Sequence, residues 1–283
     1  MSRTVVRRFV AGTSVDDAVR VSAELVAESL MVSLDHLGED TTEVGHAEAT
    51  TKAYVTLLSR LADRDLAGRA EVSVKLSAVG QALDESMALD NARAICEAAA
   101  AASTTVTIDM EDHTTTDSTL GIVRELRQDF SSVGAVLQAY LRRTEADCRD
   151  LARPGSRVRL CKGAYREPES VAFQSRLEVD RSYVRCLRVL VEGPGYPMVA
   201  THDPRLVRIA GALLDRTDRV KGSYEYQMLF GIRPNEQRRL ADAGETVRVY
   251  VPYGDEWYGY LMRRLAERPA NVAFFLRALA TKS

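Results

Sequence analysis

The feature that most constrains the fold is a regular alternation between short strand-like segments and longer helix-like segments. Segments rich in β-branched and aliphatic residues predict strands at residues 31–39, 71–77, 104–111, 132–141, 157–165, 197–203, 223–230 and 247–253. A segment with helical periodicity follows each of them. This alternation favours a parallel sheet, because a helix supplies the crossover between two parallel strands.

Eight strand–helix units in 283 residues predict a closed (β/α)8 barrel, with a doubly wound open sheet as the alternative. The helices that follow the strands are expected at residues 47–63, 83–102, 117–130, 145–152, 171–191, 206–216, 236–243 and 256–266. An extra helix precedes the first strand from Ser14, and another is expected at residues 271–280. No internal repeat, linker or low-complexity segment interrupts the sequence, so residues 1–283 are predicted to form one domain.

Composition and charge argue against several classes of function. The net charge of -2 provides no basic surface for nucleic acid. The longest apolar runs are far shorter than a membrane span, and no apolar leader follows Met1. Four scattered cysteines and four histidines show no metal-binding spacing, so no metal site is predicted. We therefore expect a cytoplasmic protein whose membrane contact, if any, is peripheral on the inner face of the cell membrane.

Polar side chains gather near the predicted carboxyl ends of the strands, where the active sites of such barrels lie. They are Glu39, Lys75, Asp109, Glu111, Gln138, Arg159, Lys162, Thr201, His202, Glu225 and Tyr250. Taken alone, each has an ordinary structural explanation, such as a solvated lysine or a hydrogen-bonded histidine. Their joint placement predicts a barrel enzyme that acts on a small anion.

The stretch 157–165 is predicted to begin as a buried strand and to end as a turn. Arg159 and Lys162 supply positive charge, and Gly163 and Ala164 then leave the backbone nearly bare of side chains. This combination suits the close approach of a flat or anionic ligand. A plain strand with a Lys-Gly turn is the structural alternative.

The helix expected at residues 256–266 carries a second cationic group. Arg263 and Arg264 follow Tyr260 by three and four residues, so helical geometry places both guanidinium groups beside the aromatic ring. Two arginines next to an aromatic wall can bind a small carboxylate through forked, charge-assisted hydrogen bonds. A solvated arginine pair on a surface helix is the common alternative.

Seven ordered motifs between about residues 31 and 277 resemble the proline dehydrogenase family. They are VSVKLSAVG, TIDMEDH, LQAYLRRT, RLCKGAYREP, ATHDPRLV, YEYQMLFG and YVPYGDEWYGYLMRRLAERPANVAFFLR. The chain resembles the monofunctional, FAD-dependent bacterial form, because no aldehyde dehydrogenase module follows. The resemblance implies a distorted (β/α)8 barrel with an extra N-terminal helix and a C-terminal helix over the barrel mouth.

The same resemblance implies an activity, a cofactor and partners. FAD would be held non-covalently, and L-proline would be oxidised to Δ1-pyrroline-5-carboxylate in the first step of proline catabolism. Electrons would pass to a membrane quinone as the acceptor. A separate pyrroline-5-carboxylate dehydrogenase would receive the product through a transient contact.

The resemblance also implies roles for individual residues. The catalytic positions are Asp109 and Arg159. The positions that bind the substrate are Lys75, Arg263, Arg264, Leu229, Tyr250, Tyr260 and Glu39, the last as a gate that pairs with the first arginine. The positions that bind the cofactor are Met110, Gln138, Arg159, Lys162, Gly163, Ala164, Thr201 and His202.

Electrostatics adds one expectation, and two rival functions stay open. Asp109 is expected to balance the cationic cluster and to orient Lys75, because several bare positive charges would repel one another. One rival is a Schiff-base aldolase or lyase on the same barrel, with Lys75 as the nucleophile. The other is a barrel that has lost catalysis and serves as a binding or scaffold protein.

Overall fold

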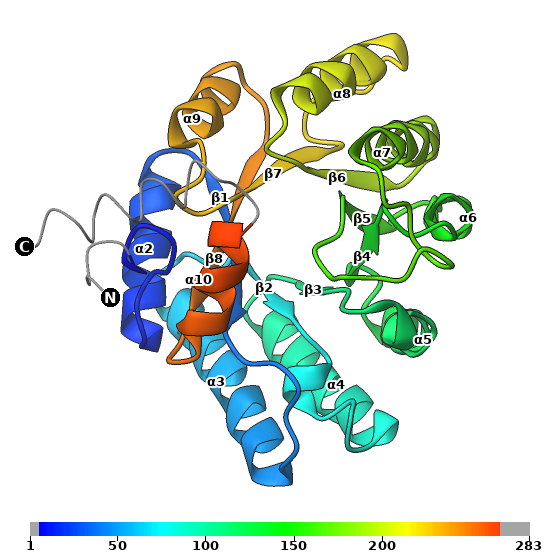
Figure 1. Cartoon of the computed structure of the whole chain (residues 1–283). Helices are drawn as coiled ribbons and strands as arrows, with labels where there is room; N and C mark the ends of the chain where they lie inside the picture. The colour runs from blue at the N-terminus through cyan, green and yellow to red at the C-terminus, as the bar shows by residue number, and fades with distance from the viewer. Residues whose placement is uncertain (1–5, 267–283) are drawn as a thin grey trace, which may run out of the picture.

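Eight parallel strands close into a barrel in the order in which they occur along the chain (Figure 1). The computed structural model describes residues 6–266, with side chains through residue 262. The strands are β1 (Met31–His36), β2 (Ala70–Val74), β3 (Val106–Ile108), β4 (Gly134–Gln138), β5 (Arg157–Cys161), β6 (Tyr196–Ala200), β7 (Glu225–Leu229) and β8 (Val247–Tyr253). Strand β8 pairs in parallel with β1 and closes the barrel. The predicted closed barrel is confirmed, and the open sheet is not formed.

Helices surround the barrel, and one precedes it. The helices are α2 (Val15–Ala27), α3 (Val44–Asp63), α4 (Glu85–Ala101), α5 (Thr116–Asp129), α6 (Thr144–Leu151), α7 (Arg176–Glu192), α8 (Pro204–Arg216), α9 (Pro234–Asp242) and α10 (Trp257–Ala266). Two short 3-10 turns, η1 (Ser77–Val79) and η2 (His113–Thr115), follow β2 and β3. None of the described helices has both the length and the apolar character needed to cross a bilayer.

The predicted helix at residues 171–191 starts too early. Residues 171–175 lie in a loop, where Leu141 and Ala172 form an isolated antiparallel bridge. Helix α7 begins only after Ser175, whose hydroxyl accepts a hydrogen bond from the Glu178 N–H and so caps the helix. The helix expected at residues 271–280 lies outside the described residues.

Alternate residues of each strand face two different environments. Arg159 on β5 contacts Ser33 on β1 and Gln227 on β7, two strands that are not its neighbours. Such contacts can form only across the lumen of the barrel, so the polar residues of the alternation point inward. The intervening residues, such as Val32 and Leu34, are fully buried in the large hydrophobic core that the strands share with the helices.

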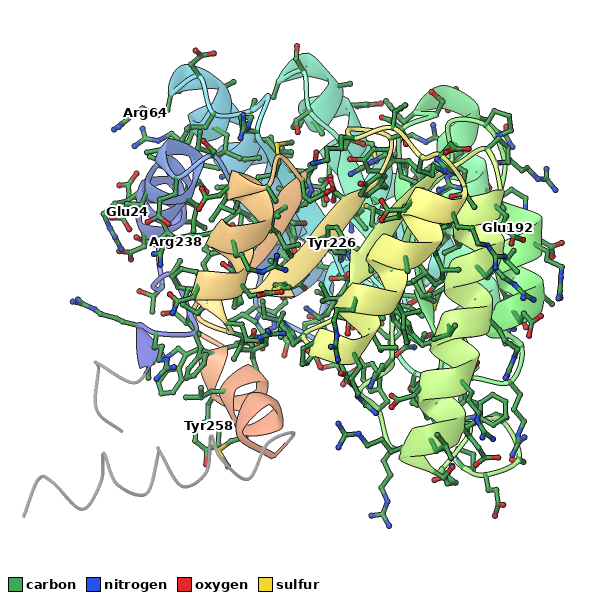
Figure 2. The ribbon with its side chains drawn as sticks, turned by 90° about the horizontal axis from the view of Figure 1, so that it is seen from above. Glu24, Arg64, Glu192, Tyr226, Arg238 and Tyr258 are labelled. Carbon is green, nitrogen blue, oxygen red and sulfur yellow. The ribbon has the colours of Figure 1, made fainter. Side chains whose placement is uncertain are left out.

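Helix α10 lies over one end of the barrel. Its Tyr260 and Leu261 pack against Leu37, which follows β1, and against Ile232, which follows β7. These two residues mark the carboxyl ends of their strands, so α10 covers the mouth at that end, as expected. Figure 2 shows α10, with Tyr258, projecting from one end of the strands.

Candidate active site

Three buried charged side chains meet near the carboxyl ends of β2, β3 and β5. Lys75 and Asp109 are the first residues after β2 and β3, and Arg159 is the central residue of β5. Only 9%, 8% and 4% of their respective surfaces are exposed. The parallel sheet accounts for this convergence, because strands that run in one direction end at one rim of the barrel.

The partner of Lys75 is Asp35, which the sequence did not single out. The Lys75 Nζ lies 2.7 Å from the Asp35 Oδ2. Asp109 instead accepts hydrogen bonds from Arg159 and Tyr250, so the expectation that Asp109 orients Lys75 is wrong. No local signal in residues 31–39 marks Asp35, because its contact depends on the register between β1 and β2.

The electrostatic surroundings of Lys75 favour its charged form. Burial alone would lower the pKa of this amine, but the carboxylates of Asp35 and Asp109 outweigh burial and raise the pKa above its ordinary value. Lys75 is therefore an ammonium ion over the physiological range of pH. A Schiff-base nucleophile needs a neutral amine, so this environment argues against the aldolase or lyase alternative.

Arg159 is held in the lumen by acceptors from several strands. Its Nη1 donates to the Asp109 Oδ1 at 2.6 Å and to the Ser73 Oγ at 2.9 Å, and its Nε donates to the Gln227 Oε1 at 2.5 Å. Its Cζ also lies 5.3 Å from the centre of the Tyr250 ring, within the range of a cation–π contact. The guanidinium group is therefore fixed as a positive charge below the mouth.

Tyr250 completes this cluster from the middle of β8 rather than from its end. Its hydroxyl donates to the Asp109 Oδ2 at 2.8 Å. Burial, together with the charge of Asp109, holds the pKa of the Tyr250 phenol well above its ordinary value, so the group stays neutral and donates. Both oxygens of the Asp109 carboxylate consequently accept hydrogen bonds.

Glu225 lies at the opposite end of the barrel from the mouth, which corrects the sequence-based placement. It is the first residue of β7, at the amino end of that strand. Its two oxygens accept hydrogen bonds from the Arg248 guanidinium at 2.7 and 3.0 Å. The direction of the strand therefore separates Glu225 from the mouth.

Lys162 lies at the rim, among acidic side chains of α7 and α8. Its Nζ donates to Asp180 and lies 3.4 Å from the Asp203 Oδ2. Arg205 binds both carboxylates, at 2.7 Å for Asp180 and 2.6 Å for Asp203. These ion pairs fix the lysine side chain beside the turn that follows β5.

The backbone conformation and the packing of Tyr140 both require glycine at position 163. Its φ of +111° favours glycine, and a Cβ atom at this position would lie 2.3 Å from the ring of Tyr140. The Tyr140 hydroxyl in turn donates to the Glu167 Oε1 at 3.2 Å. Glu167 also binds the backbone and ring of His113, so one carboxylate ties together the loops after β3, β4 and β5.

A hollow of about 400 Å³ lies beside this turn. Its lining includes the aromatic rings of Tyr140, Tyr165 and Phe173 and the cationic side chains of Lys162, Arg166 and Arg176. The two carboxylates in the lining are already paired, Glu167 with His113 and Tyr140, and Asp180 with Lys162 and Arg205. Aromatic walls with a few cations suit a ligand that is both aromatic and anionic. The chemistry of the lining therefore fits a flavin nucleotide.

The other positions expected to bind the cofactor also lie along the loops after β3 to β6. Met110 is buried, and Ala164 is exposed beside Gly163. The Gln138 amide donates to the Glu111 carbonyl at 2.7 Å, and the Thr201 hydroxyl accepts from the Asp203 N–H at 3.1 Å. The His202 Nε2 accepts from the Leu229 N–H at 2.9 Å, so a neutral His202 carries its proton on Nδ1.

The positions expected to bind the substrate are described only in part. Leu229 packs against the cluster that contains the buried Tyr260, so these two wall residues are brought together. Arg263 and Arg264 belong to α10, but their side chains lie outside the described residues. The expected pairing of Glu39 with Arg263 therefore also lies outside them.

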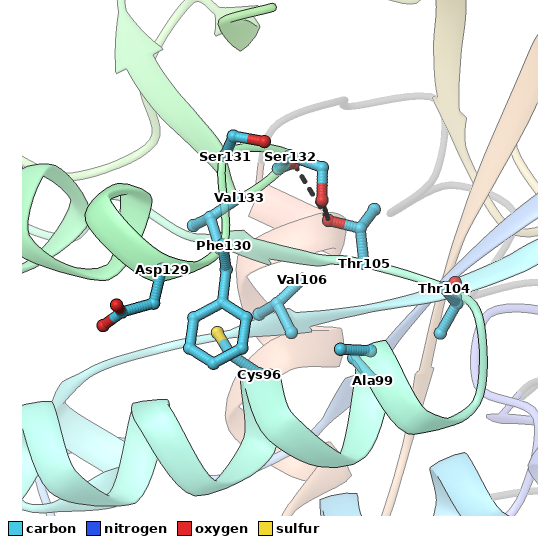
Figure 3. Close-up of a pocket in the computed structure, with 11 residues that line it drawn as sticks. Cys96, Ala99, Thr104, Thr105, Val106, Asp129, Phe130, Ser131, Ser132 and Val133 are labelled. Carbon is cyan, nitrogen blue, oxygen red and sulfur yellow. Dashed lines mark hydrogen bonds between the residues drawn. The ribbon is translucent and has the colours of Figure 1, made fainter.

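A hollow of about 220 Å³ lies between α4, α5 and the start of β3 (Figure 3). Its lining includes Cys96, Val106 and Phe130, and a hydrogen bond joins the Thr105 hydroxyl to the Ser132 carbonyl. No group of three or more side chains within residues 6–262 is arranged to hold a metal ion.

The sequence comparisons agree on one family. The family model for proline dehydrogenase matches residues 18–277. Proline dehydrogenase 1 of Bacillus subtilis (strain 168) is 37% identical over 281 residues, which cover 99% of this chain and 92% of that protein. The proline dehydrogenase of Deinococcus radiodurans is 37% identical over 278 residues, which cover 96% of this chain and 89% of that protein.

Solved structures show the same barrel within longer proteins. Proline utilization A (PutA) from Bdellovibrio bacteriovorus, inactivated by N-propargylglycine, has a TM-score of 0.85 at 25% identity over 93% of this chain. PutA from Bradyrhizobium japonicum has a TM-score of 0.77 at 22% identity and supports the fold alone. This chain spans 32% and 30% of the lengths of these two proteins. The match of the family model over most of the chain, together with the relatives of nearly equal length, establishes that the chain belongs to the proline dehydrogenase family.

Proposed function

We propose that this chain oxidises L-proline to Δ1-pyrroline-5-carboxylate, with FAD as its cofactor and a membrane quinone as the electron acceptor. The observation that carries the proposal is the buried cluster at the barrel mouth, in which Asp35 holds Lys75 as an ammonium ion and Asp109 binds Arg159 and Tyr250. A chain of this family that keeps these groups in contact has the means to bind and orient a small amino acid.

Substrate binding begins with the carboxylate of proline. Lys75 provides a charged donor at the mouth, and Arg263 and Arg264 complete the set of cations. Charge-assisted hydrogen bonds to a carboxylate supply much of the binding energy available to so small a ligand. Leu229, Tyr250 and Tyr260 provide the walls for the apolar ring. Together these contacts orient the ring carbon that is oxidised.

FAD, when bound, supplies the two-electron acceptor that the protein side chains lack. We assign its binding to Met110, Gln138, Arg159, Lys162, Gly163, Ala164, Thr201 and His202. The aromatic and cationic lining of the hollow next to Lys162 and Gly163 supports this assignment. Arg159 contributes a fixed positive charge below the mouth, which stabilises negative charge that develops there during oxidation.

The hydrogen bonds of Asp109 favour an electrostatic role over that of a base. Both of its oxygens accept hydrogen bonds, from Arg159 and from Tyr250. A carboxylate engaged in this way balances and orients Arg159 rather than removing a proton from the substrate. The proton of the proline amine then passes to solvent.

The electrons pass to a quinone, and the product passes to a second enzyme. A membrane quinone requires at least transient, peripheral contact with the inner face of the cell membrane. The product is reactive, so a transient contact with a separate pyrroline-5-carboxylate dehydrogenase forms part of the proposal.

The decisive experiment is a visible absorption spectrum of the purified protein, recorded without oxygen before and after L-proline is added. We expect flavin bands that bleach with L-proline, and extraction should release FAD. A soluble quinone analogue should then restore the bands. A colourless protein, or a flavin that proline does not reduce, would overturn the proposal, and trapping of a substrate on Lys75 by borohydride would favour the aldolase or lyase.

A further inference from the structure

We infer that Asp35 is a positioning residue for the substrate, because it fixes the ammonium group of Lys75 at the barrel mouth and keeps that group charged. The inference rests on the proposed function, in which Lys75 binds the carboxylate of proline. Asp35 itself does not touch the substrate and acts through Lys75.

The geometry of the pair points the cation outward. Asp35 is the fifth residue of β1 and aligns with Ser73 of β2, two residues before Lys75. The carboxylate and the ammonium are 2.7 Å apart. The side chain of Asp35 is 1% exposed and that of Lys75 is 11% exposed. The carboxylate therefore lies deeper in the barrel, and the lysine side chain lies nearer the opening.

Within the described part of the chain, Lys75 is the only hydrogen-bond partner of the Asp35 side chain. Its Oδ1 is buried there without a hydrogen-bond partner, and its Oδ2 binds only Lys75. Asp109, by contrast, is engaged by Arg159 and Tyr250. A buried carboxylate with a single partner is costly to fold, so its presence is best explained by what it does to that partner.

Among the charged groups that face Lys75, Asp35 has the largest influence on the charge of the lysine. Asp35, Asp109 and Glu39 all raise the pKa of Lys75, and Asp35 has the largest effect among them. Glu111 and His36 also interact electrostatically with Lys75. Asp109 is already balanced by Arg159 at 2.6 Å. Once the charge of Asp35 is removed, burial should prevail and the amine should lose its proton at a lower pH.

The test is the isosteric variant Asp35→Asn, with the KM for L-proline measured between about pH 6 and about pH 9. We expect KM to rise about tenfold at neutral pH, whereas kcat changes less than about threefold, because the lost interaction is one of binding. The ratio of the variant KM to the wild-type KM should grow about tenfold further toward high pH, as Lys75 loses its proton. Cyclopentanecarboxylate keeps the ring and the acid of proline but lacks the amine. The ratio of its inhibition constant in the variant to that in the wild type should rise with pH in the same way.

A second substitution shows whether Asp35 acts through Lys75. Lys75→Arg places a cation there that cannot lose its proton in this range of pH. In the Lys75→Arg background, Asp35→Asn should still alter KM, but the ratio should no longer depend on pH. With Lys75 present, a ratio of variant to wild-type KM that does not change with pH would overturn the inference. A ratio that still grows with pH in the Lys75→Arg background would overturn it as well.

Two further variants keep the test interpretable. Asp147→Asn is the matched control, because Asp147 is also a buried acid paired with an arginine, Arg143, but it lies on α6 in the outer ring. Its pH profile should match that of the wild type. If Asp35→Asn does not fold, Asp35→Glu replaces it: KM should rise without a new pH dependence, and an added pH dependence would count against the inference. A wild-type protein whose flavin proline fails to reduce would instead overturn the proposed function.

Discussion

The lumen of the barrel contains two layers of charge that use the same kinds of residue in different ways. The amino layer consists of Glu71, Arg157, Glu225 and Arg248. The mouth layer consists of Asp35, Lys75, Asp109 and Arg159. Each layer pairs two carboxylates with two cations, and none of these side chains is more than 12% exposed. Their charge content alone would not tell a structural network from a binding site.

The two layers differ in how many of their polar atoms form hydrogen bonds or ion pairs within the layer. Arg248 forms a forked pair with Glu225, and Arg157 binds Glu71 at 2.6 Å. A hollow of about 280 Å³ leads to this layer from the amino end, so access by itself does not make a site. In the mouth layer, Lys75 makes one hydrogen bond within the described residues, and one oxygen of Asp35 makes none there. The hydrogen-bonding capacity that Lys75 leaves unused there distinguishes the layer that we propose binds the substrate.

The largest contrast is expected when a buried cation is removed from each layer. Lys75→Met should lower kcat/KM by about 10²–10³-fold, because a charge-assisted contact with the substrate is lost. Arg248→Met should lower the free energy of unfolding by about 3–5 kcal/mol, because Glu225 is left buried without its partner. Its kcat/KM should stay within about threefold of the wild type where the protein is folded.

Steady-state kinetics and urea denaturation of both variants measure this contrast. Lys75→Met should cost less stability than Arg248→Met, because Lys75 forms one ion pair, with Asp35, whereas Arg248 pairs with both Glu225 and Glu71. A loss of activity in Arg248→Met as large as that in Lys75→Met, with the protein still folded, would abolish the distinction between the layers.

Lowering the pH should remove the contribution that the ionised Glu71 of the amino layer makes to the free energy of unfolding. Burial would raise the pKa of this carboxyl, but Arg157, Arg248 and Arg159 lower it to about 2. A folded-state pKa below the ordinary value stabilises the protein above the ordinary pKa, and this contribution is lost as the pH falls toward about 2. Glu71→Gln should therefore be less stable than the wild type near neutral pH, and the gap should narrow by roughly 3 kcal/mol in acid.

Urea denaturation of both proteins between about pH 6 and about pH 2 provides the measurement. Carboxyl groups elsewhere titrate equally in the two proteins, so only the narrowing of the gap reports on Glu71. A gap that stays constant with pH would mean that Glu71 is not held as an anion in the folded protein.

The sequence predicted the mouth better than the contacts within it. Strand ends are local features, so Lys75, Asp109 and Gln138 could be placed from alternation and from the turns that follow. The family resemblance added which of these positions carry chemistry. Asp35 escaped prediction because one aspartate in an amphipathic strand has no local signature, and its partner comes from the register of β1 with β2.

The amino layer was missed for a related reason. Glu71, Arg157 and Arg248 look like solvated charges near strand starts, because periodicity does not show that both faces of a strand are enclosed. Only closure of the barrel turns one face into a lumen and brings β2, β5 and β8 together across it. The same limit explains Glu225, which was predicted at the mouth but lies at the amino end of the barrel.

Gln227 connects the two layers, and its removal should have an intermediate effect. Its Oε1 accepts from Arg159, and its Nε2 donates to Glu225, both at 2.5 Å. Gln227→Leu frees the Nε of Arg159, so kcat should fall about tenfold while KM changes less than about threefold. Gln81→Leu is the control, because Gln81 binds Ser118 outside the lumen, and its kcat should be unchanged. An equal fall in kcat in the control would point to general destabilisation.

The smallest and sharpest test removes one hydroxyl group from each layer. Tyr250 donates to Asp109 in the mouth layer at 2.8 Å, and Tyr196 donates to Glu225 in the amino layer at 3.2 Å. Tyr250→Phe keeps the ring over Arg159 but frees one oxygen of Asp109, so kcat/KM should fall by about 3–10-fold, or about 1 kcal/mol. Tyr196→Phe makes the same chemical change beside a carboxylate that Arg248 still holds by two hydrogen bonds, so kcat/KM should not change. If the two variants lose activity equally, the layers are energetically coupled, through Gln227 and through Arg159, whose Nη2 lies 3.7 Å from the Glu71 Oε1. If only Tyr250→Phe responds, the saturated layer serves as a rigid base, and the chemistry belongs to the layer whose hydrogen bonds remain incomplete.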